Sequence, residues 1–120
     1  EKARGFYGRL LGMGEVEKPE RLRSRGGCWF KQGSCHVHVG VDPDFRPARK
    51  AHPAFIVERL AELAERLIKS GHTVTWDESL PNVERFYVDD PFGNRLEFLG
   101  SGAGFSERSG GSWHDERQVD

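Results

Sequence analysis

The sequence predicts an α+β fold built from two halves that repeat one order of elements. Residues 52–99 contain, in order, one strand-like run, one helical run and three more strand-like runs. Residues 3–41 contain one helical run followed by three strand-like runs. The two orders match if the first half lacks its opening strand. We therefore expect two modules, at about residues 1–42 and 52–99, joined by a linker at 43–51.

Length and composition limit the function classes. The chain has 120 residues, enough for one domain, which we place at residues 1–99. Its net charge of -1 gives no basis for a nucleic-acid partner, and it contains no apolar run long enough to span a membrane. Two cysteines, Cys28 and Cys35, are too few for a disulfide framework, so we expect small core residues and a cytoplasmic protein.

The first half offers two histidines on one strand face. A helix is predicted at residues 3–13, an extended piece at 15–20 and a charged loop at 21–25, followed by strands at 27–30 and 34–41. Side chains alternate along a strand, so His36 and His38 share one face of the second strand, while Cys35 and the valines share the other.

The second half contains the most regular helix pattern. A strand at residues 52–57 places His52 on the same face as Ala54 and Ile56. The helix predicted at 58–70 should bury a one-sided apolar stripe, and a strand follows at 72–76. The expected buried residues of the helix are Leu60, Leu63, Leu67 and Ile68.

Residues 85–99 read as a strand, a tight turn and a second strand. Asp90 and Pro91 begin the turn, and Gly93 tolerates the positive φ that such turns require. In the outgoing strand Glu97 is a carboxylate between the apolar Leu96 and Phe98. Beyond this hairpin, residues 100–120 are polar and rich in Gly and Ser, so we expect a disordered tail, with Trp113 and His114 as its conspicuous groups.

Three segments of the chain, residues 6–12, 52–55 and 86–98, resemble the vicinal oxygen chelate superfamily, which includes glyoxalase, bleomycin-resistance, fosfomycin-resistance and extradiol dioxygenase proteins. The segment Asp-Pro-Phe-Gly-Asn-Arg-Leu-Glu-Phe is the most specific of them. The resemblance implies two βαβββ modules whose curved mixed sheets surround a cleft. It also implies, for many members, a divalent metal ion held by residues on the first and last strands of each module.

The resemblance assigns candidate ligands. His52 and Glu97 match metal-binding positions of the second module, and Glu97 is also the candidate catalytic residue. His36 resembles a ligand position of the first module, and His38 lies on the same face. The fourth position belongs to the first module's opening strand, which this sequence lacks. Imidazole and carboxylate together suit Zn, Ni, Mn, Fe or Co.

Each candidate also has a structural interpretation. His52 could be hydrogen-bonded to backbone, and Glu97 could form a salt bridge with Arg85 or Arg95. Neither His36 nor His38 is favoured over the other, and both could simply face solvent. The aromatic residues of the strands could form core or cleft wall: Trp29, Phe30, Trp76, Phe86 and Tyr87.

The resemblance leads to two main functional hypotheses. One is a small metal-dependent enzyme that binds a substrate through vicinal oxygens, with lyase, isomerase, thiol-transfer or dioxygenase-like chemistry. The other is a metal-free protein that sequesters a drug, as bleomycin-resistance proteins do. A non-catalytic remnant is a third possibility, because the first module lacks a strand. Under each of the main hypotheses the partner is a small molecule and the chain is expected to form a homodimer.

Overall fold

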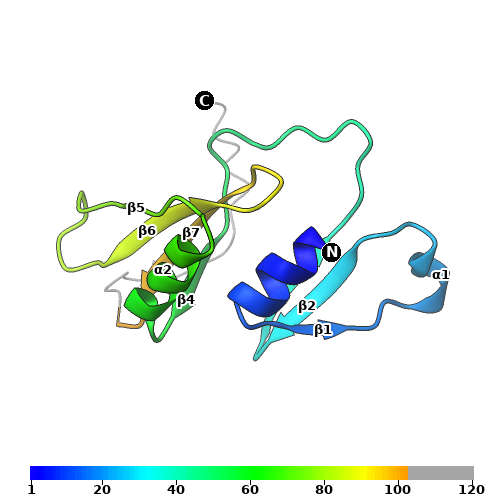
Figure 1. Cartoon of the computed structure of the whole chain (residues 1–120), viewed down its shortest axis with the longest axis horizontal. Helices are drawn as coiled ribbons and strands as arrows, with labels where there is room; N and C mark the ends of the chain where they lie inside the picture. The colour runs from blue at the N-terminus through cyan, green and yellow to red at the C-terminus, as the bar shows by residue number, and fades with distance from the viewer. Residues whose placement is uncertain (103–120) are drawn as a thin grey trace, which may run out of the picture.

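The computed structural model describes residues 1–102, which form two separate curved sheets, with η1 packed against the first and α2 against the second (Figure 1). This confirms the predicted α+β class. No helix within these residues is long and apolar enough to cross a membrane. Most of the predicted tail, with Trp113 and His114, lies outside the described residues. The proposed domain limits, 1–42, 43–51 and 52–99, stay a prediction.

The first sheet has three antiparallel strands in the order β1-β2-β3. It is preceded by η1, which is a π-helix shorter than the predicted helix at 3–13. A single helical turn, α1, occupies part of the predicted charged loop. The turn between β2 and β3 has Gly33 at φ 57, as a tight hairpin turn requires. The elements are η1 (Arg4–Leu10), β1 (Gly14–Val16), α1 (Glu20–Arg23), β2 (Cys28–Gln32) and β3 (Cys35–Val39).

The second sheet has four strands in the order β4-β7-β6-β5, with β4 parallel to β7 and the other pairs antiparallel. Its first strand begins at Ala54, two residues later than predicted. Pro53, which lacks an N–H to donate, precedes the strand, and its carbonyl accepts a bond from Glu97 N. The elements are β4 (Ala54–Val57), α2 (Leu60–Lys69), β5 (Thr75–Trp76), β6 (Arg85–Asp89) and β7 (Arg95–Gly100).

The two sheets confirm the predicted repeat. In the second sheet β4 lies along the outer edge of the last strand, β7. The corresponding last strand of the first sheet is β3, which pairs with β2 on one edge. Within residues 1–102 no strand pairs with its other edge, so the described first half lacks the equivalent of β4.

Helix α2 covers one face of the second sheet with a narrower stripe than predicted. Leu60, Leu63, Ala64 and Leu67 are buried, whereas Ile68 is 55% exposed, so the expected burial of Ile68 is wrong. Successive residues are about 100° apart around a helix. Leu67 lies at the centre of the buried stripe, and Ile68, the next residue, therefore lies at its margin. The helix stops at Gly71, whose φ of +89 disfavours any other residue.

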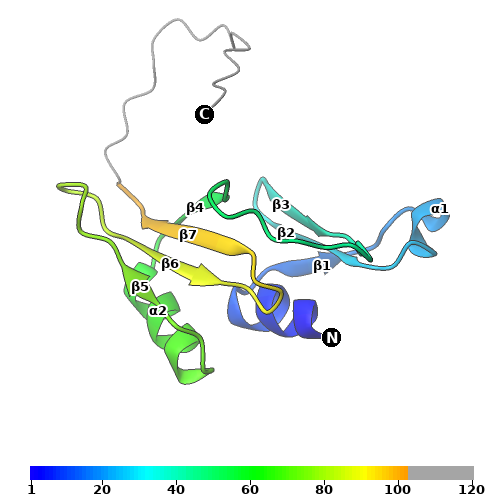
Figure 2. The same ribbon diagram turned by 90° about the horizontal axis from the view of Figure 1, so that it is seen from above.

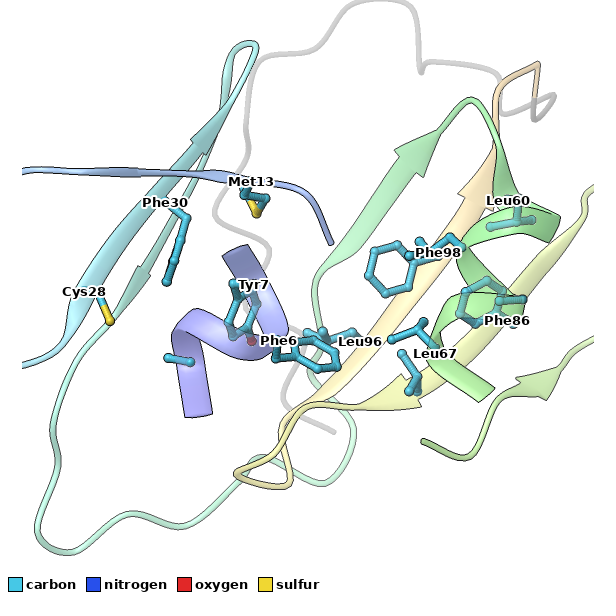
Figure 3. Packing of buried hydrophobic residues seen from close by; sticks show 14 residues of the cluster. Phe6, Tyr7, Met13, Cys28, Phe30, Leu60, Leu67, Phe86, Leu96 and Phe98 are labelled. Carbon is cyan, nitrogen blue, oxygen red and sulfur yellow. The ribbon is translucent and has the colours of Figure 1, made fainter. Parts of the chain in front are cut away.

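The core joins the two halves. Helices η1 and α2 lie side by side on the same side of both sheets (Figure 2). Figure 3 shows side chains of η1 between those of the first sheet and those of α2 and the second sheet. The largest fully buried side chains come from all of these elements: Phe6, Phe30, Leu67 and Phe86. Phe30 and Phe86 are therefore core residues, while Trp76 is 45% exposed.

One buried hydrogen bond ties η1 to the hairpin that carries Glu97. The Tyr7 hydroxyl donates to Asp90 Oδ2 at 2.6 Å, across 83 residues of sequence. The same carboxylate accepts from the backbone N–H groups of Phe92 and Asn94 and from Asn94 Nδ2 within the β6–β7 turn. Gly93, with φ 89, has the predicted left-handed conformation in this turn. The turn that begins β7 is thus anchored to the other half of the chain.

The faces of the sheets opposite the core carry the polar candidates. Along β6, Phe86 and Val88 are buried against the helix side, and Tyr87 alternates with them. Tyr87 is the cross-strand partner of Glu97, so the two point away from the helices together. On the first sheet, Trp29 pairs with His38 and Lys31 with His36 across β2 and β3, on the face opposite buried Phe30. We call these two surfaces the open faces.

Candidate metal centre

Strand pairing brings His52 and Glu97 together, although they are distant in sequence. Parallel pairing of β4 with β7 places Ala54 opposite Glu97, and His52 comes just before β4 on the same edge. His52 Nε2 lies 2.8 Å from Glu97 Oε1. The side chains are 21% and 8% exposed, respectively, so the contact is largely shielded from water. These two predicted ligands therefore form a single pair in the structure.

A second contact fixes the orientation of the His52 ring. Its Nδ1 is 2.6 Å from the carbonyl oxygen of Lys50. A carbonyl can only accept a hydrogen bond, so Nδ1 carries a proton. The lone pair of the neutral ring is then on Nε2, facing Glu97. The ring either binds a cation through Nε2 or becomes a positively charged imidazolium that donates to Glu97.

A contact with Arg85 fixes the orientation of the Glu97 carboxylate. Arg85 Nη1 donates to Glu97 Oε2 at 3.4 Å, which leaves Oε1 facing His52. Burial alone would raise the pKa of Glu97, but the His52 hydrogen bond and the Arg85 charge outweigh burial and lower it. Glu97 is therefore an ionised carboxylate near neutral pH. The salt bridge of Glu97 with Arg85 is present, as the structural interpretation expected, and it leaves Oε1 directed at His52. The role of Glu97 as a metal ligand stays a prediction.

Arg85 itself is shared between two carboxylates. Its Nη2 donates to Asp77 Oδ2 at 2.8 Å and to Ser79 Oγ at 3.3 Å. The Arg85 side chain is 15% exposed, and its Nε, which is buried, has no partner within the described residues. Arg85 thus links the β5–β6 loop to Glu97 and restricts how the Glu97 carboxylate can turn.

The pair has a spacing that fits adjacent ligands of one metal ion. Two ligands at about 2.1 Å from an octahedral ion and at a right angle to each other are about 3.0 Å apart. The observed 2.8 Å between His52 Nε2 and Glu97 Oε1 needs little adjustment to reach that value. Each side chain of the pair also has an outer partner of the kind that orients metal-binding residues, the Lys50 carbonyl for His52 and Arg85 for Glu97.

The other two candidate ligands lie elsewhere. His36 and His38 are exposed on the open face of the first sheet, where the His38 ring stacks on Trp29 with centroids 3.7 Å apart. Residues 1–102 contain no group of three or more His, Cys, Asp or Glu side chains arranged to hold a metal. A single copy of the described chain therefore does not combine His36 or His38 with the His52–Glu97 pair.

Two neighbours of the pair, Arg85 and Tyr87, were named from the sequence, whereas two others were not. The sequence offered Arg85 as a salt-bridge partner of Glu97 and Tyr87 as a core or cleft-wall residue. In the structure, strand alternation places both on the same face as Glu97. The Tyr87 ring makes an edge contact with His52, with centroids 5.4 Å apart. Burial, followed by the charge of Glu97, raises the pKa of Tyr87. The Lys50 carbonyl and Asp77 were missed, because loop conformation leaves no periodic signal in sequence.

Known structures share this arrangement of sheets and helices. A glyoxalase family protein from Bacillus anthracis is 54% identical in sequence, with a TM-score of 0.79, and the match covers 82% of this chain and 81% of that one. This chain belongs to the glyoxalase family of the vicinal oxygen chelate superfamily. The resemblance expected from residues 6–12, 52–55 and 86–98 is therefore confirmed.

More distant structures share the glyoxalase fold alone. A fosfomycin resistance protein from Listeria monocytogenes is 14% identical, with a TM-score of 0.69, and the match covers 82% of this chain and 81% of that one. An antibiotic-binding protein from Streptomyces is 18% identical, with a TM-score of 0.65 and coverage of 82% and 84%. Protein-family models and curated proteins gave no match to this glyoxalase-family chain.

Proposed function

We propose that this glyoxalase-family chain is a metal-dependent enzyme acting on a small molecule that binds through vicinal oxygens. His52 and Glu97 are the proposed ligands of a divalent ion, with Zn, Ni, Mn, Fe and Co as the candidates. The observation that carries the proposal is the contact of His52 Nε2 with Glu97 Oε1 at 2.8 Å, in which each side chain is oriented by its own outer partner.

The surrounding residues have separable roles in this proposal. A bound divalent ion would polarise a substrate oxygen and stabilise negative charge that develops on it. The Lys50 carbonyl keeps the proton of His52 on Nδ1, so Nε2 remains a ligand. Arg85 keeps Glu97 ionised and fixes its free oxygen. Tyr87 covers one side of the pair and limits its contact with water. Lyase, isomerase and thiol-transfer chemistries all use these same roles.

A second copy of the chain would supply a further ligand. His36 and His38 do not reach the pair within residues 1–102, yet both lie on an open face with their rings exposed. We propose a homodimer in which the open face of the first sheet of one copy meets that of the second sheet of the other. Sedimentation at micromolar concentration should show a dimer. A monomer at every concentration would contradict this arrangement.

Metal content of the purified protein tests the central proposal. Protein prepared without chelator should contain close to one divalent ion per chain, measured by plasma mass spectrometry. His52→Ala and Glu97→Gln should lose most of it. Glu65→Gln is a matched control, because Glu65 is an exposed residue on α2, far from the pair in sequence and on another element. Wild-type protein without bound metal, even after incubation with each candidate ion, would overturn the proposal.

A metal-free drug-binding protein is the second candidate function. The stacked Trp29 and His38 rings on an open face favour it, because such a platform can hold an aromatic ligand. Tryptophan fluorescence with an aromatic cationic drug separates the two functions. Binding that is unchanged by chelator and by Glu97→Gln supports sequestration. Binding that requires metal, or no binding at all, rejects it.

A further inference from the structure

The free edge of β3 distinguishes the first sheet from the second. In the second sheet the last strand, β7, is flanked on both edges, by β6 and by the parallel strand β4. In the first sheet the last strand, β3, pairs only with β2 within residues 1–102. The backbone N–H and C=O groups along its other edge have no strand partner there, and such an edge can pair with a further strand.

The outermost strands of the two sheets are protected against pairing, whereas β3 is not. β1 has three residues and is followed directly by Glu17, Lys18 and Pro19, and β5 has only two residues. Short edge strands, charged side chains and prolines commonly prevent unwanted strand pairing. β3 is a five-residue strand, Cys35–Val39, that contains no Asp, Glu, Lys, Arg or Pro. Its edge is therefore suited to a partner.

The core-side residues of β3 are less buried than those of β7. Leu96 and Phe98 of β7 are 2% and 3% exposed. Cys35, Val37 and Val39 of β3 pack against the core but are only partly buried. This difference is expected when one strand is flanked on both edges and the other on one edge. A strand beside β3 would remove more of this apolar surface from water, which is favourable.

A hollow lies beside this edge, between the two halves of the chain. It has a volume of about 460 Å³ and is bounded by Cys35 at the start of β3 and by Phe55 and Val57 of β4. Its other apolar lining residues come from the segment after η1, from α2 and from β7: Leu11, Met13, Leu63 and Phe98. Side chains on one face of a bound strand can therefore enter an apolar space.

The charges around the hollow indicate the kind of strand. Its exposed lining residues include two acidic and two basic side chains, which balance in charge: Glu58, Arg59, Glu62 and Arg66. Since β3 adds no charged residue, the edge and the hollow together match an uncharged, apolar segment. We propose that they bind an extended peptide segment whose alternate residues are apolar and face η1 and α2. By the repeat of the two halves, the segment runs parallel to β3, as β4 runs parallel to β7.

A synthetic peptide with the sequence of residues 52–59 is the probe, because it contains β4, the strand that occupies the corresponding position beside β7. It is added to the isotope-labelled full chain and followed by NMR. Chelator is present throughout, because the inference does not depend on the proposed metal ion. The amide signals of Cys35–Val39 should shift, and some of these amides should exchange more slowly with solvent because they donate hydrogen bonds to the peptide.

A control peptide carries Phe55→Asp and Val57→Asp, at the positions that pack against the core in β4. It should bind about a hundredfold more weakly, or less, because two apolar side chains are no longer buried. This comparison leaves the protein itself unchanged, so it does not depend on how a variant folds.

Two protein variants test the hollow. Leu11→Arg places a charge in its apolar wall and should weaken binding of the 52–59 peptide about tenfold. Ile68→Arg changes an exposed apolar residue of α2 outside the hollow and should bind as wild type does. Circular dichroism verifies that both variants are folded. Wild-type affinity in folded Leu11→Arg would overturn the assignment of the hollow.

Three other results would overturn the proposal. The first is that the 52–59 peptide leaves the β3 amides unshifted, or that both peptides bind equally. The second is protection of these amides in dilute protein without peptide, because the chain itself then covers the edge. The third is protection that appears without peptide only as the protein concentration rises, which assigns the edge to a second copy.

Discussion

The buried hydrogen bond between Tyr7 and Asp90 leads to a prediction about how the hairpin of Glu97 is held in place. Tyr7→Phe removes one hydroxyl and leaves the ring, which stacks on Phe30 at 5.7 Å and contacts Phe6 edge-on at 5.1 Å. Packing should therefore change little. Within residues 1–102, the variant removes the side-chain hydrogen bond that joins η1 to the β6–β7 turn and leaves the rest of the Tyr7 side chain in place.

The expected loss follows from what remains around Asp90. A hydrogen bond to a charged group contributes about 1.5–3 kcal/mol. Asn94 Nδ2 still donates to Asp90 Oδ2 in the variant, so that oxygen keeps one partner. The free energy of unfolding should therefore fall by about 1.5 kcal/mol, at the lower end of that range. For a domain of roughly 100 residues this corresponds to a fall in Tm of about 6–12 °C.

Alkaline pH gives the same bond a second readout. Burial, with the hydrogen bond to Asp90 and its charge, raises the pKa of Tyr7. A raised pKa contributes stability that is complete below the unfolded value of about 10 and is lost as pH rises above it. Wild type should therefore lose stability above about pH 10 more steeply than Tyr7→Phe.

Urea unfolding of Tyr7→Phe, Asp90→Asn and the double variant measures the interaction as a coupling free energy. Asp89→Asn, a change to the adjacent exposed carboxylate, is the control. A coupling energy near zero, together with parallel alkaline profiles, would refute this account of the hairpin anchor.

Three further predictions concern the core, a glycine and the site. Leu67→Ala, at a fully buried position, should cost about 2–5 kcal/mol in urea unfolding, whereas Ile68→Ala should cost less than about 1 kcal/mol; equal losses would contradict the stripe described for α2. Gly27→Ala should prevent normal folding, because φ is +81 and a Cβ would overlap the end of β3, whereas Gly40→Ala, with open space around it, should fold as judged by circular dichroism. In chelator, the lowered pKa of Glu97 adds to the free energy of unfolding at pH values above the ordinary glutamate pKa of about 4.3, and this contribution is lost as pH falls through the folded pKa. Stability should therefore fall less steeply with acidification in Glu97→Gln than in wild type. The same slope in both proteins would contradict the geometry of the pair.

Periodic features of the sequence predicted much of this fold. Residues 85–99 were read correctly as a strand, a turn and a second strand that carries Glu97 between Leu96 and Phe98, because the strand repeat of two residues is independent of distant structure. The helical stripe was found for the same reason, although its margin was misjudged at Ile68. The repeat of elements also predicted the absence of an opening strand in the first half, which the three-stranded sheet confirms.

Features that depend on register and loop path were not predictable from pattern alone. The approach of His52 to Glu97 depends on β4 pairing in parallel with β7 at one register. The Lys50 carbonyl reaches His52 because of the linker conformation, which has no period. The position of His36 and His38 relative to the pair depends on how the two sheets are joined through η1 and α2. Strand alternation cannot give that relation, so the role of these histidines stays a proposal.

The parallel pairing of β4 with β7 also has a kinetic consequence. His52 and Glu97 are 45 residues apart in sequence, and α2, β5 and β6 lie between them along the chain. Closing so long a loop costs entropy before the contacts at its ends can form. An ion that needs both side chains can bind only once this closure is complete. The proposed ion should therefore leave the folding rate unchanged and slow unfolding, so that it would set the lifetime of the native state rather than the time needed to reach it.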